Sequence, residues 1–317
     1  MKKLGVLGAG AFGTALALAY SSKFNVCLFS WFEDHVTRMR KTRSNEFLSD
    51  AYIPDEINIE VALNLEGGAF DYLLWVFPLK PTISLLEQMT DKLCSTTVII
   101  CSKGLMPDGA LLASTFEERL HGSKIGYLAG PNFAYDIAKG NISASDIVFA
   151  DYDDAVAVGH ELSTERLKLS PHSDLVGAQI CGAMKNVIAI ACGIAMGLSS
   201  SSNTHAAILT LALREMRNLG IAAGASESTF YGLCGVGDLI LTAFNEASRN
   251  FSFGMRISAG EQADEIIKNF GAVCEGYDTT ENVIALARRY SVSIPICEAV
   301  HKILFERQDP HRILDVF

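Results

Sequence analysis

The stretch KLGVLGAGAFG, residues 3–13, decides how the beginning of the chain folds. Residues 3–7 predict a short apolar strand, and Ala11 to Ala19 have the composition of a helix. Between them, the spacing Gly-x-Gly-x-x-Gly places Gly8, Gly10 and Gly13. In a strand–turn–helix unit, the first glycine permits a tight turn, the second lets the backbone approach a pyrophosphate, and the third lets the helix pack on the strand. Such glycines also occur in plain turns, but this context favours a dinucleotide-binding site at the helix N-terminus.

The rest of the first half alternates between strands and helices. We expect strands at residues 25–30, 71–77, 96–101, 124–129 and 144–150, with helices at 81–89 and 111–120. The strands DYLLWVF and TTVIIC are mostly continuous apolar runs, which is typical of a parallel sheet covered on both faces. The pattern predicts a doubly wound α/β domain.

The second half is expected to be helical. After Pro171 we expect helices at residues 174–198, 205–219, 263–269, 280–290 and 297–305, and we find no convincing strand. We therefore predict a dinucleotide-binding domain over residues 1–172, followed by an all-α substrate-binding and catalytic domain over residues 173–317.

The composition excludes several classes of protein. A hydrophobic share of 49% supports large buried cores, and the formal net charge of −10 argues against general binding to nucleic acid or anionic membranes. The longest apolar run, residues 187–198, is shorter than the ~18–20 residues of a membrane span. The 8 cysteines have no Cys-x-x-Cys spacing and indicate reduced thiols in a cytoplasmic protein. The histidines show no paired-ligand spacing that would predict a metal site.

Lys185 lies in the apolar helix expected at residues 174–198, where Gln179 and Asn186 are the other polar side chains beyond Leu175. No acid stands within one or two turns of it on this helix. Its stem could cover apolar surface while its ammonium group reaches water. Alternatively, the ammonium group lies in a dry site and exchanges a proton with a carbonyl or hydroxyl group.

Other polar residues are candidates for the same site. Lys103 stands at the end of the strand at 96–101, where ligands bind in open α/β sheets, although a solvated loop lysine is the alternative. Asp238 follows Gly235-Val236-Gly237 and either orients a lysine or caps a helix. Ser248-Arg249-Asn250 offers a guanidinium between two short hydrogen-bonding side chains, which suits a phosphate group, although it could also be an ordinary polar loop.

In this order, the motifs resemble the bacterial-type NAD(P)-dependent glycerol-3-phosphate dehydrogenase family over essentially the whole chain. The matching stretches are the glycine loop, CSKGL (101–105), GPNFA (130–134), GAMKNVIAIACG (182–193), GVGDLILT (235–242), SRN (248–250) and CEGYDTTENV (274–283). The resemblance implies a Rossmann-type α/β domain followed by an all-α domain. It implies an oxidoreductase that uses NAD or NADP to reduce dihydroxyacetone phosphate reversibly to sn-glycerol 3-phosphate, for phospholipid synthesis in the cytoplasm. We expect no nucleic-acid or membrane partner, and the apolar helices are compatible with a homodimer.

The resemblance also implies roles for individual residues. Lys185 matches the proton-transferring lysine, and Lys103 and Asp238 match the other catalytic groups. The residues that match the substrate-binding set are Lys103, Gly130, Asn132, Lys185, Asn186, Asp238, Thr242, Ser248, Arg249 and Asn250. The residues assigned to the cofactor are Gly8, Gly10, Ala11, Phe12, Gly13, Phe32, Lys103, Ala134, Arg249, Val273 and Glu275.

Three residues depart from the family's pattern. Asn132 stands where Ser or Thr is usual and still offers a hydrogen-bond donor, Phe32 stands where an arginine is frequent, and Leu211 replaces a usual arginine in a helix. A dehydrogenase for another ketone would leave Ser248-Arg249-Asn250 without a phosphate to bind. A nucleotide-sensing module without chemistry would leave the two lysines and Asp238 without a role.

The tip of the second strand bears on cofactor choice. An arginine there favours the 2′-phosphate of NADP, and an acid favours the 2′-hydroxyl of NAD. Here Ser30 can form hydrogen bonds, the aromatic residues 31–32 cannot pair with a phosphate, and the acids 33–34 would repel one. We therefore predict that NADH is used at least as well as NADPH. The basic residues that could fold back and reverse this preference are Arg38, Arg40, Lys41 and Arg43.

Overall fold

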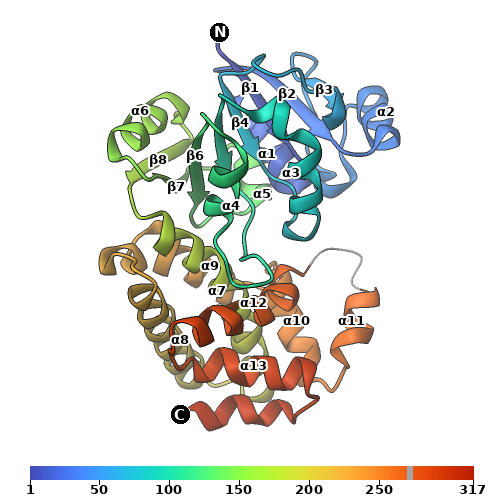
Figure 1. Cartoon of the computed structure of the whole chain (residues 1–317). Coiled ribbons are helices and arrows are strands. Elements are labelled where there is room, and N and C mark those ends of the chain that lie inside the picture. Colours follow the sequence, from blue (N-terminus) through green and yellow to red (C-terminus); the bar gives the residue numbers. More distant parts are fainter. Residues whose placement is uncertain (270–273) are drawn as a thin grey trace. The chain divides into compact units, whose positions relative to one another are not determined.

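The computed structural model describes residues 1–269 and 274–317, and the chain divides into two compact units (Figure 1). The first unit comprises Met1–Ser102 and Ala113–Leu175, and the second comprises Lys103–Leu112 and Val176–Phe317. The sequence pattern places one boundary at 172/173. In the structure this boundary lies a few residues later, between Leu175 and Val176. The segment Lys103–Leu112, from within the first half of the chain, also belongs to the second unit.

The first unit is built on one 8-stranded sheet with the order β3-β2-β1-β4-β5-β6-β7-β8. Its strands are β1 (Lys3–Leu7), β2 (Asn25–Ser30), β3 (Asn58–Val61), β4 (Tyr72–Trp75), β5 (Thr97–Ile100), β6 (Lys124–Ala129), β7 (Ser143–Phe149) and β8 (Leu167–His172). Neighbouring strands are parallel, except that β6 and β7 are antiparallel. The order of the first six strands is the Rossmann order, which confirms the predicted doubly wound fold.

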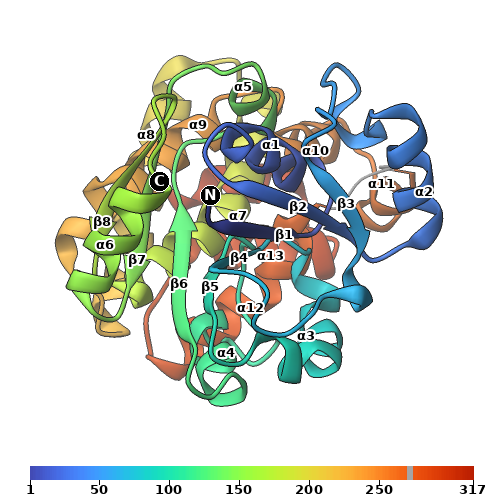
Figure 2. The same ribbon diagram turned by 90° about the horizontal axis from the view of Figure 1, so that it is seen from above.

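Helices cover both faces of this sheet, with α1 and α5 on one face and α3 and α4 on the other (Figure 2). The helices of the first unit are α1 (Ala11–Tyr20), α2 (Glu33–Thr42), α3 (Leu79–Leu93), α4 (Leu112–Arg119), α5 (Ala134–Ala138) and α6 (Tyr152–Leu162). All four residues of β4 are buried, as expected for a strand between two helical layers. At the carboxyl edge, Leu7 pairs with both Phe29 and Trp75, so the loops that follow β1, β2 and β4 start from a common edge of the sheet.

The sequence predicts six strands to within two residues and misses β3 and β8. Both are edge strands, and each buries few of its residues. Because an edge strand lacks the continuous apolar run of a central strand, its pattern resembles that of a loop. Pro171, after which we expect helices, is part of β8.

The regular secondary structure in the described part of the second unit is helical. Its helices are α7 (Leu175–Leu198), α8 (Ser202–Ala222), α9 (Asp238–Ala243), α10 (Arg249–Ser258), α11 (Ala263–Asn269), α12 (Glu275–Arg289) and α13 (Pro295–Phe305). Shorter helical turns are η3 (Glu227–Tyr231), η4 (Leu233–Gly237) and η5 (Pro310–Val316). The short helices α9 and α10 are not among the expected elements, and α12 begins five residues earlier than expected, at Glu275.

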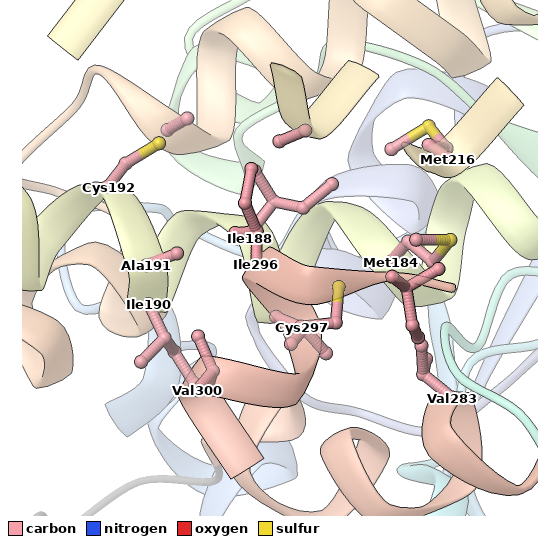
Figure 3. Close-up of a cluster of buried hydrophobic side chains, with 14 of the residues drawn as sticks. Met184, Ile188, Ile190, Ala191, Cys192, Met216, Val283, Ile296, Cys297 and Val300 are labelled. Carbon is pink, nitrogen blue, oxygen red and sulfur yellow. The ribbon is translucent and has the colours of Figure 1, made fainter. Parts of the chain in front are cut away.

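Helix α7 forms the centre of the helical core. Figure 3 shows its side chains Met184, Ile188 and Cys192 among apolar side chains of α8, α12 and α13. This helix is long and apolar enough to cross a membrane, but 83% of its most apolar window is buried inside the protein, as in the core helix of a globular unit. Its crossing with α10 is close, since a Cβ on Gly193 would lie 2.1 Å from the Phe251 carbonyl oxygen.

Candidate active site

The glycine loop has the geometry that a dinucleotide requires. Gly8 has a φ of 123°, which favours glycine, and a Cβ on Gly13 would lie 1.9 Å from the Gly8 carbonyl oxygen. A Cβ on Gly10 would instead point into open space, at the N-cap position of α1. The first turn of α1, with Ala11 and Phe12, carries no acid. A negatively charged pyrophosphate therefore fits the exposed backbone of Gly10 and the N-terminus of α1.

At the tip of β2, Ser30 forms its hydrogen bonds within the protein. This side chain is 4% exposed, and its Oγ lies 3.0 Å from His35 Nδ1 and accepts a hydrogen bond from the Phe32 N–H at 3.4 Å. Ser30 is thus part of the interior, whereas the Phe32 ring is 70% exposed. The surface at this tip is formed by Phe32 and the first turn of α2, with Glu33 and Asp34.

Three of the four basic residues that could fold back have other partners. Arg38 forms an ion pair with Glu46 at 2.5 Å, and Arg40 donates to the Ile59 carbonyl at 2.7 Å and pairs with Glu60. Arg43 donates to main-chain carbonyl groups, including that of Ile57 at 3.1 Å. Each of these arginines would have to give up its contacts before it could bind a cofactor phosphate.

Lys103 opens a segment that packs within the second unit. Asn282 of α12 donates a hydrogen bond to the Leu105 carbonyl at 2.7 Å, and Leu105 is fully buried in the helical core. Gly109 has a φ of 77° and approaches the backbone of Leu286 so closely that a Cβ would lie 2.8 Å from it. Asn282 was not singled out from the sequence, although a buried amide on an apolar helix face is a recognisable signal.

Lys185 and Asp238 form a buried ion pair. Lys185 Nζ lies 2.6 Å and 2.7 Å from the two carboxylate oxygens of Asp238, and the side chains are 12% and 2% exposed, respectively. Asp238 is the first residue of α9, and its side chain does not cap that helix. Thr242 Oγ1 donates to the Asp238 carbonyl at 2.7 Å. Lys185 is therefore held by a carboxylate from another helix rather than extended into water.

Asn186, Asn250 and the start of α12 form a closed ring of hydrogen bonds. Asn250 Nδ2 donates to Asn186 Oδ1 at 2.9 Å, and Asn186 Nδ2 donates to Glu275 Oε2 at 3.2 Å. The Gly276 N–H completes the ring by donating to Asn250 Oδ1 at 2.9 Å. Burial raises the pKa of the Cys274 thiol to about 11, and this thiol donates to the same oxygen at 3.2 Å. The ring fixes Glu275 and Asn186 beside each other on α12 and α7.

The three residues of the Ser248-Arg249-Asn250 stretch have different surroundings. Ser248 is buried and caps α10 by accepting a hydrogen bond from the Phe251 N–H at 3.4 Å. Asn250 is buried in the ring described above. Arg249 is the first residue of α10 and is exposed. Arg249 is thus the exposed residue of this stretch.

Asn132 donates its hydrogen bonds inward. Its Nδ2 lies 3.0 Å from the Ala144 carbonyl and 2.5 Å from Ser145 Oγ, and both acceptors belong to β7. The buried Oδ1 has no hydrogen-bond partner within the described part of the chain. The amide protons expected to contact a ligand therefore hold this loop on the sheet. Gly130 lies equally close to β7, since a Cβ there would be 2.7 Å from Ser145 Cα.

The remaining predicted residues have varied environments. Ala134 begins α5 in the first unit. Leu211 is half-buried and packs on the helical core, which accounts for an apolar residue at this position. Val273 lies outside the described residues.

Comparisons with known proteins cover nearly the whole chain. The protein-family model described as NAD-dependent glycerol-3-phosphate dehydrogenase N-terminus matches residues 3–156. The family model for the C-terminus of the same enzyme matches residues 174–315. Glycerol-3-phosphate dehydrogenase (NAD(P)+) of Nitrosomonas europaea is 36% identical over 307 residues, which are 96% of this chain and 93% of that protein. The protein of the same name from Colwellia psychrerythraea is 35% identical over 314 residues, which are 97% and 94% of the two chains.

A solved structure agrees with these sequences. The crystal structure of glycerol-3-phosphate dehydrogenase from Coxiella burnetii superposes with a TM-score of 0.94 at 30% identity, covering 99% of this chain and 98% of that one. The sheet order and the glycine loop fit the same relationship. The chain belongs to the NAD-dependent glycerol-3-phosphate dehydrogenase family of NAD(P)-dependent oxidoreductases.

Proposed function

We propose that this protein reduces dihydroxyacetone phosphate reversibly to sn-glycerol 3-phosphate, with Lys185 as the proton donor. The observation that carries the proposal is the buried ion pair between Lys185 and Asp238. A largely buried ammonium group, held by two contacts of 2.6 Å and 2.7 Å, supports the proposal because such a group can donate a proton to a developing alkoxide. The family to which the chain belongs supports the choice of substrate.

The residues of the first unit fit a nicotinamide cofactor. Gly8, Gly10 and Gly13 would hold its pyrophosphate at the N-terminus of α1, and Phe12 lies in the same turn. When bound, the cofactor supplies the hydride that reduces the C2 carbonyl of the triose. Ala134, Val273 and Glu275 stay predicted contacts of this cofactor.

Lys185 completes the reduction by transferring a proton from its Nζ to the C2 oxygen. The new C–H and O–H bonds convert the carbonyl to an alcohol, and in the reverse direction Lys185 takes the proton back. Asp238 keeps the ammonium group oriented, and Thr242 contacts Asp238 in turn. Orientation of this kind contributes to the rate because the proton donor need not be ordered during the reaction.

Arg249 is the proposed ligand of the substrate phosphate. Its guanidinium is exposed at the N-terminus of α10, where both its own charge and the helix dipole favour an anion. Ser248 and Asn250 support this site by capping α10 and by holding it to α7. Lys103 is proposed as a second cation that polarises the carbonyl group.

We also propose that NADH is used at least as well as NADPH. Ser30 is engaged by His35, and Arg38, Arg40 and Arg43 have the partners described above. The acids that begin α2 would repel a 2′-phosphate.

The setting of the reaction stays a proposal as well. We propose a cytoplasmic enzyme that serves phospholipid synthesis; its eight cysteines are free thiols, which supports a reducing compartment. A homodimer also stays a prediction, and exposed apolar side chains of the second unit, such as Tyr231, Ile240 and Phe244, are compatible with it.

The activity is tested by following NADH oxidation with purified protein. We expect oxidation that depends on dihydroxyacetone phosphate, forms sn-glycerol 3-phosphate in equal amounts, and is much slower with unphosphorylated dihydroxyacetone. A protein that oxidises NADH equally well with both ketones, or with neither, would refute the proposed substrate.

A further inference from the structure

A group of buried polar side chains lies beneath the glycine loop in the first unit. Thr14, Ser30, His35 and Asn45 are 0%, 4%, 6% and 1% exposed, respectively. Buried polar groups are costly unless they are hydrogen-bonded, so the contacts of this group show what it holds in place. We call these four residues the loop support.

Asn45 connects the loop support to the glycine loop. Its Nδ2 donates to the Ala9 carbonyl at 2.9 Å and to Thr14 Oγ1 at 2.7 Å, while its Oδ1 accepts from the Phe47 N–H at 3.1 Å. A main-chain carbonyl requires a donor and a main-chain N–H requires an acceptor. These two contacts fix the orientation of the Asn45 amide.

The orientation of Asn45 determines the protons of His35. Since Asn45 Oδ1 is an acceptor, His35 Nε2, at 3.3 Å, carries a proton and donates to it. In a neutral imidazole, His35 Nδ1 is then an acceptor, and it receives the Ser30 hydroxyl proton at 3.0 Å. Ser30 Oγ in turn accepts from the Phe32 N–H. One directed chain of hydrogen bonds thus runs from the tip of β2 to Ala9.

The bond to Ala9 also sets the direction of the next N–H group. The chain has no cis peptide bond among its described residues, and in a trans peptide the C=O and N–H groups point in opposite directions. Because the Ala9 carbonyl points toward Asn45, the Gly10 N–H points away from it. The space beside the Gly10 Cα is open.

We propose that Asn45 is a positioning residue for the dinucleotide. By holding the Ala9 carbonyl, it presents the Gly10 N–H to the cofactor pyrophosphate. Through His35 and Ser30, it also holds the backbone N–H of Phe32 in a fixed position relative to the glycine loop. The inference rests on the proposed function only in that the ligand is a dinucleotide. Hydrogen bonds within the protein hold the loop in this arrangement, so its order need not come from contacts with the cofactor.

The test is a fluorescence titration of NADH into full-length variants that lack only parts of the loop support. Asn45→Asp keeps the size and the acceptor but replaces the donor to Ala9 with a repelling oxygen. We expect at least a tenfold increase in the NADH Kd, with kcat at saturating NADH within about threefold of the wild type. Thr14→Val is a milder variant that deprives one Asn45 N–H of its acceptor, and it should raise the Kd about threefold.

A matched control separates binding from general stability. Tyr72→Phe removes a partly buried hydroxyl contact, to Glu161, at the opposite end of the parallel strands, and it should lower the Tm without changing the NADH Kd. If Asn45→Asp and Thr14→Val, both folded at the assay temperature, bind NADH within twofold of the wild type, the inference is overturned. Because the readout is NADH binding by itself, failure to reduce dihydroxyacetone phosphate would sink the proposed function separately.

Discussion

Replacing Lys185 with methionine should lower both stability and turnover, for two different reasons. The substitution keeps most of the stem volume in α7 but removes the charge that lies 2.6 Å from Asp238. Asp238 is 2% exposed, so its carboxylate would be left buried without a counter-charge. Removing one partner of a buried ion pair costs about 3–5 kcal/mol. At roughly 2–4 °C per kcal/mol, the Tm should fall by about 10 °C.

Turnover should fall for a separate reason. Loss of a positioned proton donor lowers kcat by at least ~10²-fold, since general acid catalysis contributes that much. The NADH Kd should hardly change, because Lys185 is assigned to the substrate, whereas the glycine loop is the proposed pyrophosphate site. Steady-state kinetics with dihydroxyacetone phosphate measure the first quantity, and fluorescence titration measures the second.

The double variant Lys185→Met/Asp238→Asn distinguishes the two effects. It removes both charges, so most of the lost Tm should return, while kcat should stay at the level of the single variant. A Lys185→Met protein that keeps most of its turnover would refute the catalytic role. A double variant as unstable as the single one would refute the explanation by an unpaired carboxylate.

Three further predictions concern other sites. Arg249→Ala should reduce the preference in kcat/KM for dihydroxyacetone phosphate over dihydroxyacetone by roughly 10–100-fold, since a hydrogen bond to a charged group contributes ~1.5–3 kcal/mol; an unchanged ratio would place the phosphate elsewhere. Wild-type kcat/KM with NADH should equal or exceed that with NADPH, and Phe32→Arg should shift the ratio toward NADPH; a wild-type preference for NADPH above tenfold would contradict this reasoning. Burial raises the pKa of Glu215 from 4.5 to about 7. The folded protein therefore retains a proton that the unfolded chain loses between these two pH values, and stability should fall by about 3 kcal/mol as pH rises through this window. Glu215→Gln should flatten this dependence of Tm on pH, and an equally steep dependence in the variant would exclude Glu215 as its cause.

Central strands and the glycine loop could be predicted because their sequence signals are local. The continuous apolar runs of β4 and β5 reflect burial on both faces. The three glycines fit a positive φ at Gly8, open space at Gly10 and a close backbone contact at Gly13. The edge strands β3 and β8 lack such a run, since water covers part of their residues. The local sequence pattern therefore predicted the central strands of the sheet but not the two strands at its edges.

The side-chain contacts of the candidate site join different helices and strands, so the sequence of any one element does not predict them. The neighbours of Lys185 on α7 include no acid. Its partner Asp238 lies on another helix, 53 residues further along the chain, so the ion pair could not be predicted from α7 alone. Ser30 forms hydrogen bonds, as the sequence allows, but its partner His35 lies on the following helix and could not be identified from the strand alone. Similarly, Asn132 donates to β7, the next strand of the chain, at a position 12 residues further on. Such pairings arise only when the elements pack.

The proton-transferring role of Lys185 is tested most directly by chemical rescue of Lys185→Ala. This variant lacks the side chain and leaves room beside Asp238, so a small amine can take the place of the ammonium group. We expect turnover of dihydroxyacetone phosphate to rise in proportion to added methylammonium, and to stay unchanged with equal concentrations of tetramethylammonium, which carries the charge but no transferable proton. Equal rescue by both cations would contradict proton transfer by Lys185 and would leave it a purely electrostatic role.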